Sequence, residues 1–97
     1  MSDDKVLTKH PRGKKGVRIS QNKYNIIKTA VIDCLNGKEL TYFELTKCVN
    51  SMLNEKFQGS ISWYTETVKL DLEARNIIER NKEVKPQIYR ILDITHQ

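Results

Sequence analysis

Basic side chains near the N-terminus are the residues of this sequence best suited to a chemical task. Residues 1–19 carry six basic side chains against Asp3 and Asp4, which gives a net charge of +4 out of a total of +5. Lysine and arginine at this density neutralise nucleic-acid phosphates without reading base sequence. The candidate phosphate contacts in this segment are Lys9, Arg12, Lys14, Lys15 and Arg18. The same composition is typical of a solvated terminus, so both interpretations stay open.

A second set of candidate DNA contacts lies in a predicted helix over residues 60–75 and in the polar turn at 81–86. At about 100° per residue, one outward sector of this helix carries one lysine and two glutamates. Carboxylates repel the phosphate backbone, so we expect the helix to be a poor reader of DNA by itself. The candidate contacts here are Ser62, Thr65, Lys69, Lys82 and Lys85.

The same helix carries two apolar faces. One is a stripe at helical spacing that we expect to face the core: Ile61, Tyr64, Val68 and Leu72. The other lies on nearly the opposite side and consists of Trp63, Leu70 and Ala74. It either packs against the hairpin that follows or forms an interface with another molecule, including a second copy of the chain. Asp71 and Arg75 are spaced for a structural ion pair between the two faces.

No residue pattern indicates catalysis, a cofactor, a metal site or a small-molecule substrate. The Ser, Cys and His residues lack the partners that nucleophilic catalysis needs, and no glycine-rich phosphate loop is present. Cys34 and Cys48 fall in predicted helices, on or near the apolar faces, where burial statistics favour free thiols. A disulfide between them is disfavoured in the reducing compartment that we expect.

Hydrophobicity and the N-terminal residues bear on the compartment. No apolar run approaches the roughly 18 residues that a membrane span requires. The segment Met1–Lys5 is acidic and no apolar stretch follows it, so we expect no signal peptide, no membrane association and a cytoplasmic location.

Periodicity and capping residues predict the elements that position these side chains. Apolar spacings of three and four residues predict helices at about 20–37, 41–56 and 60–75. Two short alternating segments, at 77–80 and 87–92, predict an antiparallel hairpin. The second helix has the clearest start, since Thr41 and Glu44 fit the capping-box pattern, and Glu39–Leu40 allows a single extended pairing before it.

These elements predict an α+β fold of the winged-helix type, with three helices followed by a two-stranded hairpin. We assign residues 20–97 to this domain. Residues 1–19 are assigned to a flexible basic arm, because they contain few apolar side chains and several helix breakers.

The run from Gly59 to Arg75, with Trp63-Tyr64 inside it, resembles a family of small bacterial proteins catalogued as a domain of unknown function. The resemblance extends over residues 20–92, and the basic arm lies outside it. It implies a winged-helix-like domain and brings no activity or binding residue with it. The winged-helix fold and the basic arm together predict a protein that binds double-stranded DNA. The alternative is a protein-interaction or homodimerisation module that does not bind nucleic acid.

Overall fold

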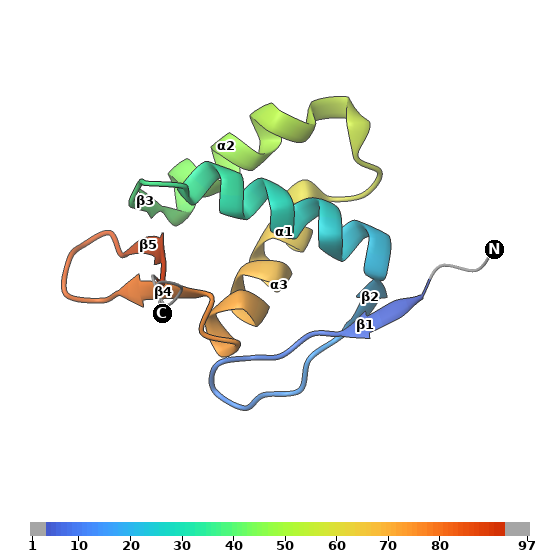
Figure 1. The fold of residues 1–97 in the computed structure, drawn as a ribbon, viewed down its shortest axis with the longest axis horizontal. Helices are drawn as coiled ribbons and strands as arrows, with labels where there is room; N and C mark the ends of the chain where they lie inside the picture. The colour runs from blue at the N-terminus through green and yellow to red at the C-terminus, as the bar shows by residue number, and fades with distance from the viewer. Residues whose placement is uncertain (1–3, 93–97) are drawn as a thin grey trace.

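Three helices and two small antiparallel sheets build the fold (Figure 1). The computed structural model describes residues 4–92. The helices are α1 (Gln21–Leu35), α2 (Tyr42–Leu53) and α3 (Ile61–Ala74), and a single 3-10 turn, η1 (Asn54–Lys56), follows α2. The strands are β1 (Lys5–Leu7), β2 (Arg18–Ser20), β3 (Leu40–Thr41), β4 (Ile78–Asn81) and β5 (Ile88–Ile91). The α+β prediction is confirmed, and residues 93–97 of the predicted domain lie outside the described residues.

Side-chain caps fix where each helix begins. Ser20 Oγ accepts a hydrogen bond from the backbone N–H of Lys23 at the start of α1, and Ser60 Oγ does the same for Trp63 at the start of α3. The predicted capping box at α2 is confirmed, because Thr41 and Glu44 each accept from the other's backbone N–H. Such caps stabilise a helix end by about 1 kcal/mol each.

The three-stranded sheet has the order β3-β5-β4, and both pairings are antiparallel. The β4–β5 hairpin confirms the two strands predicted after α3. The two-residue β3 pairs Leu40 with Tyr89, so the connection between α1 and α2 is tied to the hairpin.

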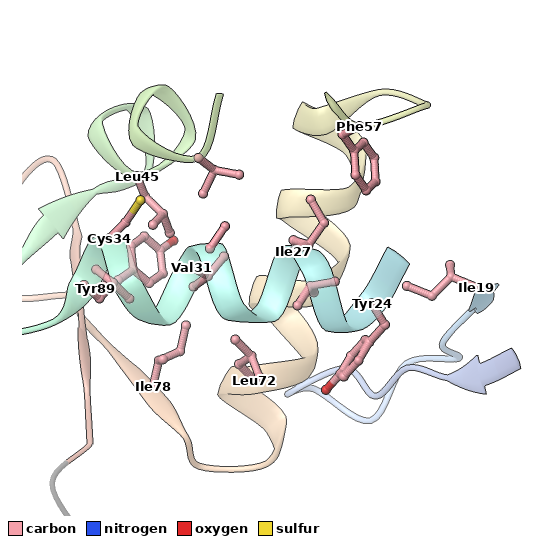
Figure 2. Close-up of a cluster of buried hydrophobic side chains, with 14 residues drawn as sticks. Ile19, Tyr24, Ile27, Val31, Cys34, Leu45, Phe57, Leu72, Ile78 and Tyr89 are labelled. Carbon is pink, nitrogen blue, oxygen red and sulfur yellow. The ribbon is translucent and has the colours of Figure 1, made fainter. Parts of the chain in front are cut away.

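The core lies where α1 crosses between α2 and α3 (Figure 2). Leu45 reaches α1 from α2 and Leu72 reaches it from α3, while Ile78 and Tyr89 close the core from the hairpin. Leu72 has no exposed surface. The predicted core stripe of α3 is confirmed, and its apolar spacing is the reason that this helix packs as it does.

Replacement of Leu72 by alanine is expected to lower the free energy of unfolding by about 2–5 kcal/mol, because it leaves a cavity at the centre of the core. Urea titration of the wild type and Leu72→Ala measures the difference. A loss below about 1 kcal/mol would contradict the packing described for this position.

The N-terminal segment differs from the prediction of an unstructured arm. Strands β1 and β2 pair antiparallel, with Val6 opposite Ile19, and the backbone N–H of Gln21 donates to the carbonyl of Asp4. Ile19 is buried in the core and Val6 packs against it. These two apolar side chains, spaced for a strand pair, tie residues 5–20 to the domain. The predicted order of elements therefore lacked two strands.

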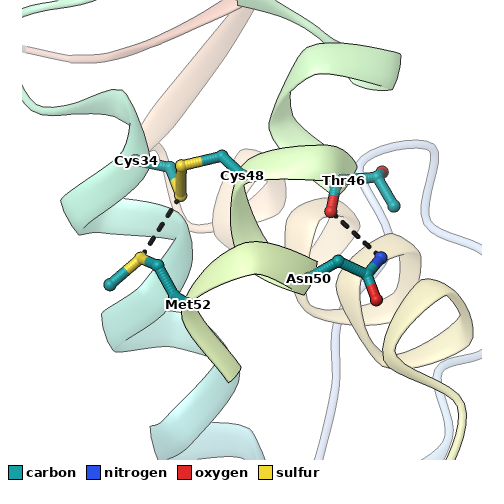
Figure 3. The surroundings of a disulfide bond; sticks show 5 residues. All are labelled: Cys34, Thr46, Cys48, Asn50 and Met52. Carbon is teal, nitrogen blue, oxygen red and sulfur yellow. Dashed lines mark hydrogen bonds between the residues drawn. A yellow bond between two sulfur atoms is a disulfide. The ribbon is translucent and has the colours of Figure 1, made fainter. Parts of the chain in front are cut away.

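The prediction that the two cysteines are free thiols is wrong. Cys34 on α1 and Cys48 on α2 form a disulfide, with a Cα–Cα distance of 6.0 Å (Figure 3). That separation is within the usual range for a disulfide. Cys34 Sγ also lies 3.5 Å from the sulfur of Met52. Sequence spacing of 14 residues gave no indication that the two helices meet at this point.

Within residues 4–92, none of the helices combines the length and apolar character needed to cross a membrane.

Candidate nucleic-acid interface

The β1–β2 loop (residues 8–17) presents most of the basic side chains predicted to contact phosphates. Backbone N–H and hydroxyl groups of Thr8 hydrogen-bond with Val17 and extend the strand pairing into the loop. Gly16 lies so close to this pairing that a Cβ atom would fall 1.7 Å from the carbonyl oxygen of Thr8, so only glycine fits. The basic side chains that the loop and β2 leave exposed are Lys9, Arg12, Lys14, Lys15 and Arg18.

A buried carboxylate holds this loop against the helices. Asp71 on α3 has no exposed surface. Its oxygens accept hydrogen bonds from the backbone N–H of Lys9 at 2.8 Å, from Arg75 Nε at 2.8 Å and from the hydroxyl of Tyr24 on α1. The predicted Asp71–Arg75 pair is confirmed, and the contact with Lys9 joins the loop to α3 across 62 positions of sequence.

Among the partners of Asp71, Tyr24 has a strongly raised pKa. Burial raises the pKa of its hydroxyl above the usual value, and the hydrogen bond to Asp71 together with the charge of that carboxylate raises the pKa further. The bond to Asp71 also raises the pKa of Arg75, which stays charged. In the folded protein Tyr24 therefore keeps its proton at pH values where the unfolded chain loses it.

We expect this difference to make the protein less stable in alkali. Below a pH of about 10 both states hold the Tyr24 proton, so the contribution is complete; above it the unfolded chain is favoured increasingly as pH rises. Tyr24→Phe removes this dependence and also removes the bond to Asp71, so the variant is less stable at neutral pH. Urea titrations between about pH 8 and about pH 11 should show the gap between wild type and variant narrowing. A gap that stays constant over this range would contradict the expectation.

The orientation of α3 corrects two predicted DNA contacts. Thr65 is fully buried and Lys69 is only 2% exposed, whereas Ser62 is exposed as predicted. Thr65 and Lys69 lie beside the core stripe on the helix circumference. The buried sector of α3 is therefore wider than its apolar residues alone indicated. Neither side chain reaches the protein surface, so neither is available to contact DNA.

Lys69 is held by anions and aromatic rings inside the protein. Its Nζ lies 3.1 Å from Glu73 and 3.6 Å from Glu66. The same atom lies 4.7 Å from the ring centroid of Tyr89 and 5.5 Å from that of Tyr42. Cations over aromatic faces are stabilised by the ring quadrupole. Lys69 is therefore a structural residue that joins α3 to the hairpin and to α2.

The β4–β5 turn (residues 82–87) carries two more of the predicted DNA contacts, Lys82 and Lys85, and both are exposed. Arg80, just before it, instead donates two hydrogen bonds to Glu73, at 3.1 and 3.0 Å. The bonds to Glu73 raise the pKa of Arg80, which keeps its charge. Arg80 thus fixes the hairpin to α3 and places the turn beside it.

Residues of the β1–β2 loop, of α3 and of the β4–β5 hairpin line an open groove of about 330 Å³, which we call the α3 groove. Its principal lining residues come from three elements: His10, Arg12 and Lys14 from the loop, Glu66, Leu70 and Glu73 from α3, and Arg80 and Lys82 from the hairpin. Exposed cations that lie 68 positions apart in sequence, Lys14 and Lys82, therefore line one site.

In the described part of the chain, the carboxylates of this groove form salt bridges, whereas the exposed lysines and arginines around it do not. Within residues 4–92, no salt bridge involves the basic side chains of the β1–β2 loop, of Arg18 or of the β4–β5 turn. The acidic residues of the groove are already paired, since Glu73 binds both Lys69 and Arg80, and Glu66 lies near Lys69. The surface is therefore free to attract an anion despite its two carboxylates.

The second apolar face of α3 is divided in the structure. Leu70 and Ala74 are half-buried and line pockets with the β1–β2 loop, so this loop lies near the face as well as the predicted hairpin. Trp63 is 48% exposed at the beginning of the helix. The three residues do not form one continuous exposed patch.

In the part of the chain that the structure describes, no three His, Cys, Asp or Glu side chains gather closely enough to hold a metal ion.

Sequence reasoning missed His10, Glu66 and Glu73 as members of the groove. The sequence showed only that residues 5–20 contain no acidic side chain and that the outward sector of α3 is acidic. Nothing in the sequence indicated that the two segments meet.

The model of the family of unknown function DUF6958 matches residues 5–89 of the chain. The chain belongs to this family. The DUF6958 match begins at β1, so it includes the β1–β2 hairpin, which the resemblance seen in the sequence had left outside. No curated protein and no solved structure matches the chain.

Proposed function

We propose that this protein binds double-stranded DNA through its phosphate backbone, with the β1–β2 loop and the β4–β5 turn as the two contacting segments. The observation that carries the proposal is the α3 groove, where Arg12 and Lys14 of the loop line the same site as Lys82 of the turn. Phosphate contacts from lysine and arginine supply most of non-specific DNA affinity.

We also propose that the fold acts as a winged helix, with the β4–β5 hairpin as the wing. Support comes from the position of the hairpin directly after α3 and from the pairing of β3 with β5. The β1–β2 hairpin is an addition that places a second basic segment on the other side of α3. In this arrangement α3 is a spacer between two phosphate contacts, since its buried Lys69 takes no part in binding.

Charge reversal on the two segments tests the proposal. Lys14→Glu and Lys82→Glu should each weaken binding to a random-sequence duplex by roughly tenfold or more, because like charges placed together cost several kcal/mol. Lys47→Glu is the matched control, since Lys47 is exposed on α2, on the other side of α1 from the loop (Figure 1). Fluorescence anisotropy with labelled duplex gives the affinities. Equal affinities for the wild type, Lys14→Glu and Lys82→Glu would refute the proposal.

A further inference from the structure

We propose that Trp63 stacks on an unpaired base where bound DNA passes from duplex to single strand. This inference rests on the proposed function and adds a preferred form of DNA to it. Three features of the structure carry it: the fixed position of the Trp63 ring, its place on the same face of α3 as the groove, and the free cations beside that groove.

The Trp63 ring is held in place although it is half-exposed. It contacts the ring of Tyr64 edge-on, with centroids 4.9 Å apart and an interplanar angle of 83°. Tyr64 in turn packs edge-on against buried Phe57 at 5.2 Å, and Lys23 Nζ lies 5.3 Å from the Tyr64 ring. An exposed indole supported in this way loses little conformational freedom when a ligand stacks on it.

Trp63 and Leu70 lie on one face of α3. Seven helical residues span about 700°, which is within about 20° of two full turns, and about 10 Å along the axis. Leu70 lines the α3 groove. In a stacked strand each nucleotide advances about 3.4 Å along the helix axis, so the distance of about 10 Å along α3 corresponds to roughly three nucleotides.

The chemistry of this face favours an unpaired base over a paired one. A base inside a duplex is already stacked, and its removal from the stack costs a few kcal/mol. A base in a single-stranded overhang is free to stack on an aromatic ring, and proteins that bind single strands combine such rings with basic grooves. The Trp63 face and the α3 groove together match this combination, with the groove holding phosphates and the indole receiving the first free base.

Intrinsic fluorescence gives a direct test, because Trp63 is the only tryptophan in the sequence. The probes are a blunt duplex and the same duplex with a thymine overhang. Stacking should quench Trp63 fluorescence with the overhang probe, which should bind roughly tenfold more tightly than the blunt one. Trp63→Ala should abolish this preference without changing the salt dependence of binding, while Trp63→Phe should keep most of it. Phe43→Ala, at an aromatic residue 73% exposed on α2, is the control and should leave the preference intact.

Each contrary result has a distinct meaning. Equal affinity for both probes without quenching would overturn this inference and leave the proposed function standing. Failure of both probes to bind would overturn the two together. Light scattering that shows a wild-type dimer and a Trp63→Ala monomer would assign Trp63 to an interface between copies of the chain and would also overturn the inference. Quenching in the wild type decides the matter even if Trp63→Ala fails to fold.

Discussion

Asp71→Asn is expected to lower the free energy of unfolding by about 2–4 kcal/mol, because Asp71 is fully buried and hydrogen bonds to charged groups contribute about 1.5–3 kcal/mol each. Three donors converge on this carboxylate, from Lys9, Tyr24 and Arg75. An amide has one oxygen, and its NH₂ group would face donors, so at least one buried hydrogen bond is lost. Urea titration of the wild type and the variant measures the loss.

The same substitution should loosen the β1–β2 loop, since the backbone of Lys9 loses its partner on α3. Trypsin should then cleave the variant faster after the basic residues of the loop. Asp33→Asn is the matched control, because Asp33 is exposed on α1, and its effect should stay within about 0.5 kcal/mol. A wild-type rate of cleavage in Asp71→Asn would show that the loop is held by other contacts.

Lys69→Glu is expected to destabilise the protein by at least about 3–5 kcal/mol. The new carboxylate would lie beside Glu66 and Glu73 in place of the cation that now pairs with them. It would also face the rings of Tyr42 and Tyr89, whose negative quadrupoles repel an anion. Thermal unfolding should show a midpoint lower by roughly 15 °C or more for a domain of this size.

Lys82→Glu makes the same change of charge at an exposed position and should alter stability by no more than about 0.5 kcal/mol. The two variants therefore separate a structural lysine from a surface one. If Lys69→Glu were as stable as Lys82→Glu, the buried position of Lys69 would be wrong.

Local patterns allowed much of the fold to be predicted. Each helix begins at a polar cap recognisable in the sequence, Ser20, Thr41 or Ser60, and each carries an apolar stripe at helical spacing. The β4–β5 hairpin was also visible, because two alternating segments flank a polar turn. These features depend on neighbours within a few positions, and that is what a single sequence records well.

Three features were predicted wrongly because they depend on residues far apart in the sequence: the burial of Lys69, the β1–β2 hairpin and the disulfide. Lys69 was placed outside because its angle around the helix lies beyond the apolar stripe, but the carboxylate of Glu73 and the rings of Tyr89 and Tyr42 hold it inside. The β1–β2 hairpin was missed because its strands have three residues each and one of its anchors, Asp71, lies far along the chain. The disulfide depends in the same way on how α1 and α2 pack.

The candidate site was predicted in part. The basic segments were identified from composition, and their side chains are exposed in the structure, but the groove that unites them comes from the folding of the loop over α3. Removal of residues 1–19 would delete buried Ile19 as well as the cations, so point substitutions separate binding from folding better than truncation does.

The salt dependence of DNA binding tests most directly whether the loop and the turn form one phosphate-binding site. The observed affinity for a random-sequence duplex is measured over a range of salt for the wild type, Lys14→Ala/Lys82→Ala and Lys47→Ala. Each lost phosphate contact removes about 0.9 from the slope of log affinity against log salt, so the double variant should show a slope shallower by about 1.8. Lys47→Ala should keep the wild-type slope. A double variant that binds DNA with an unchanged slope would show that the loop and the turn do not form a phosphate-binding site.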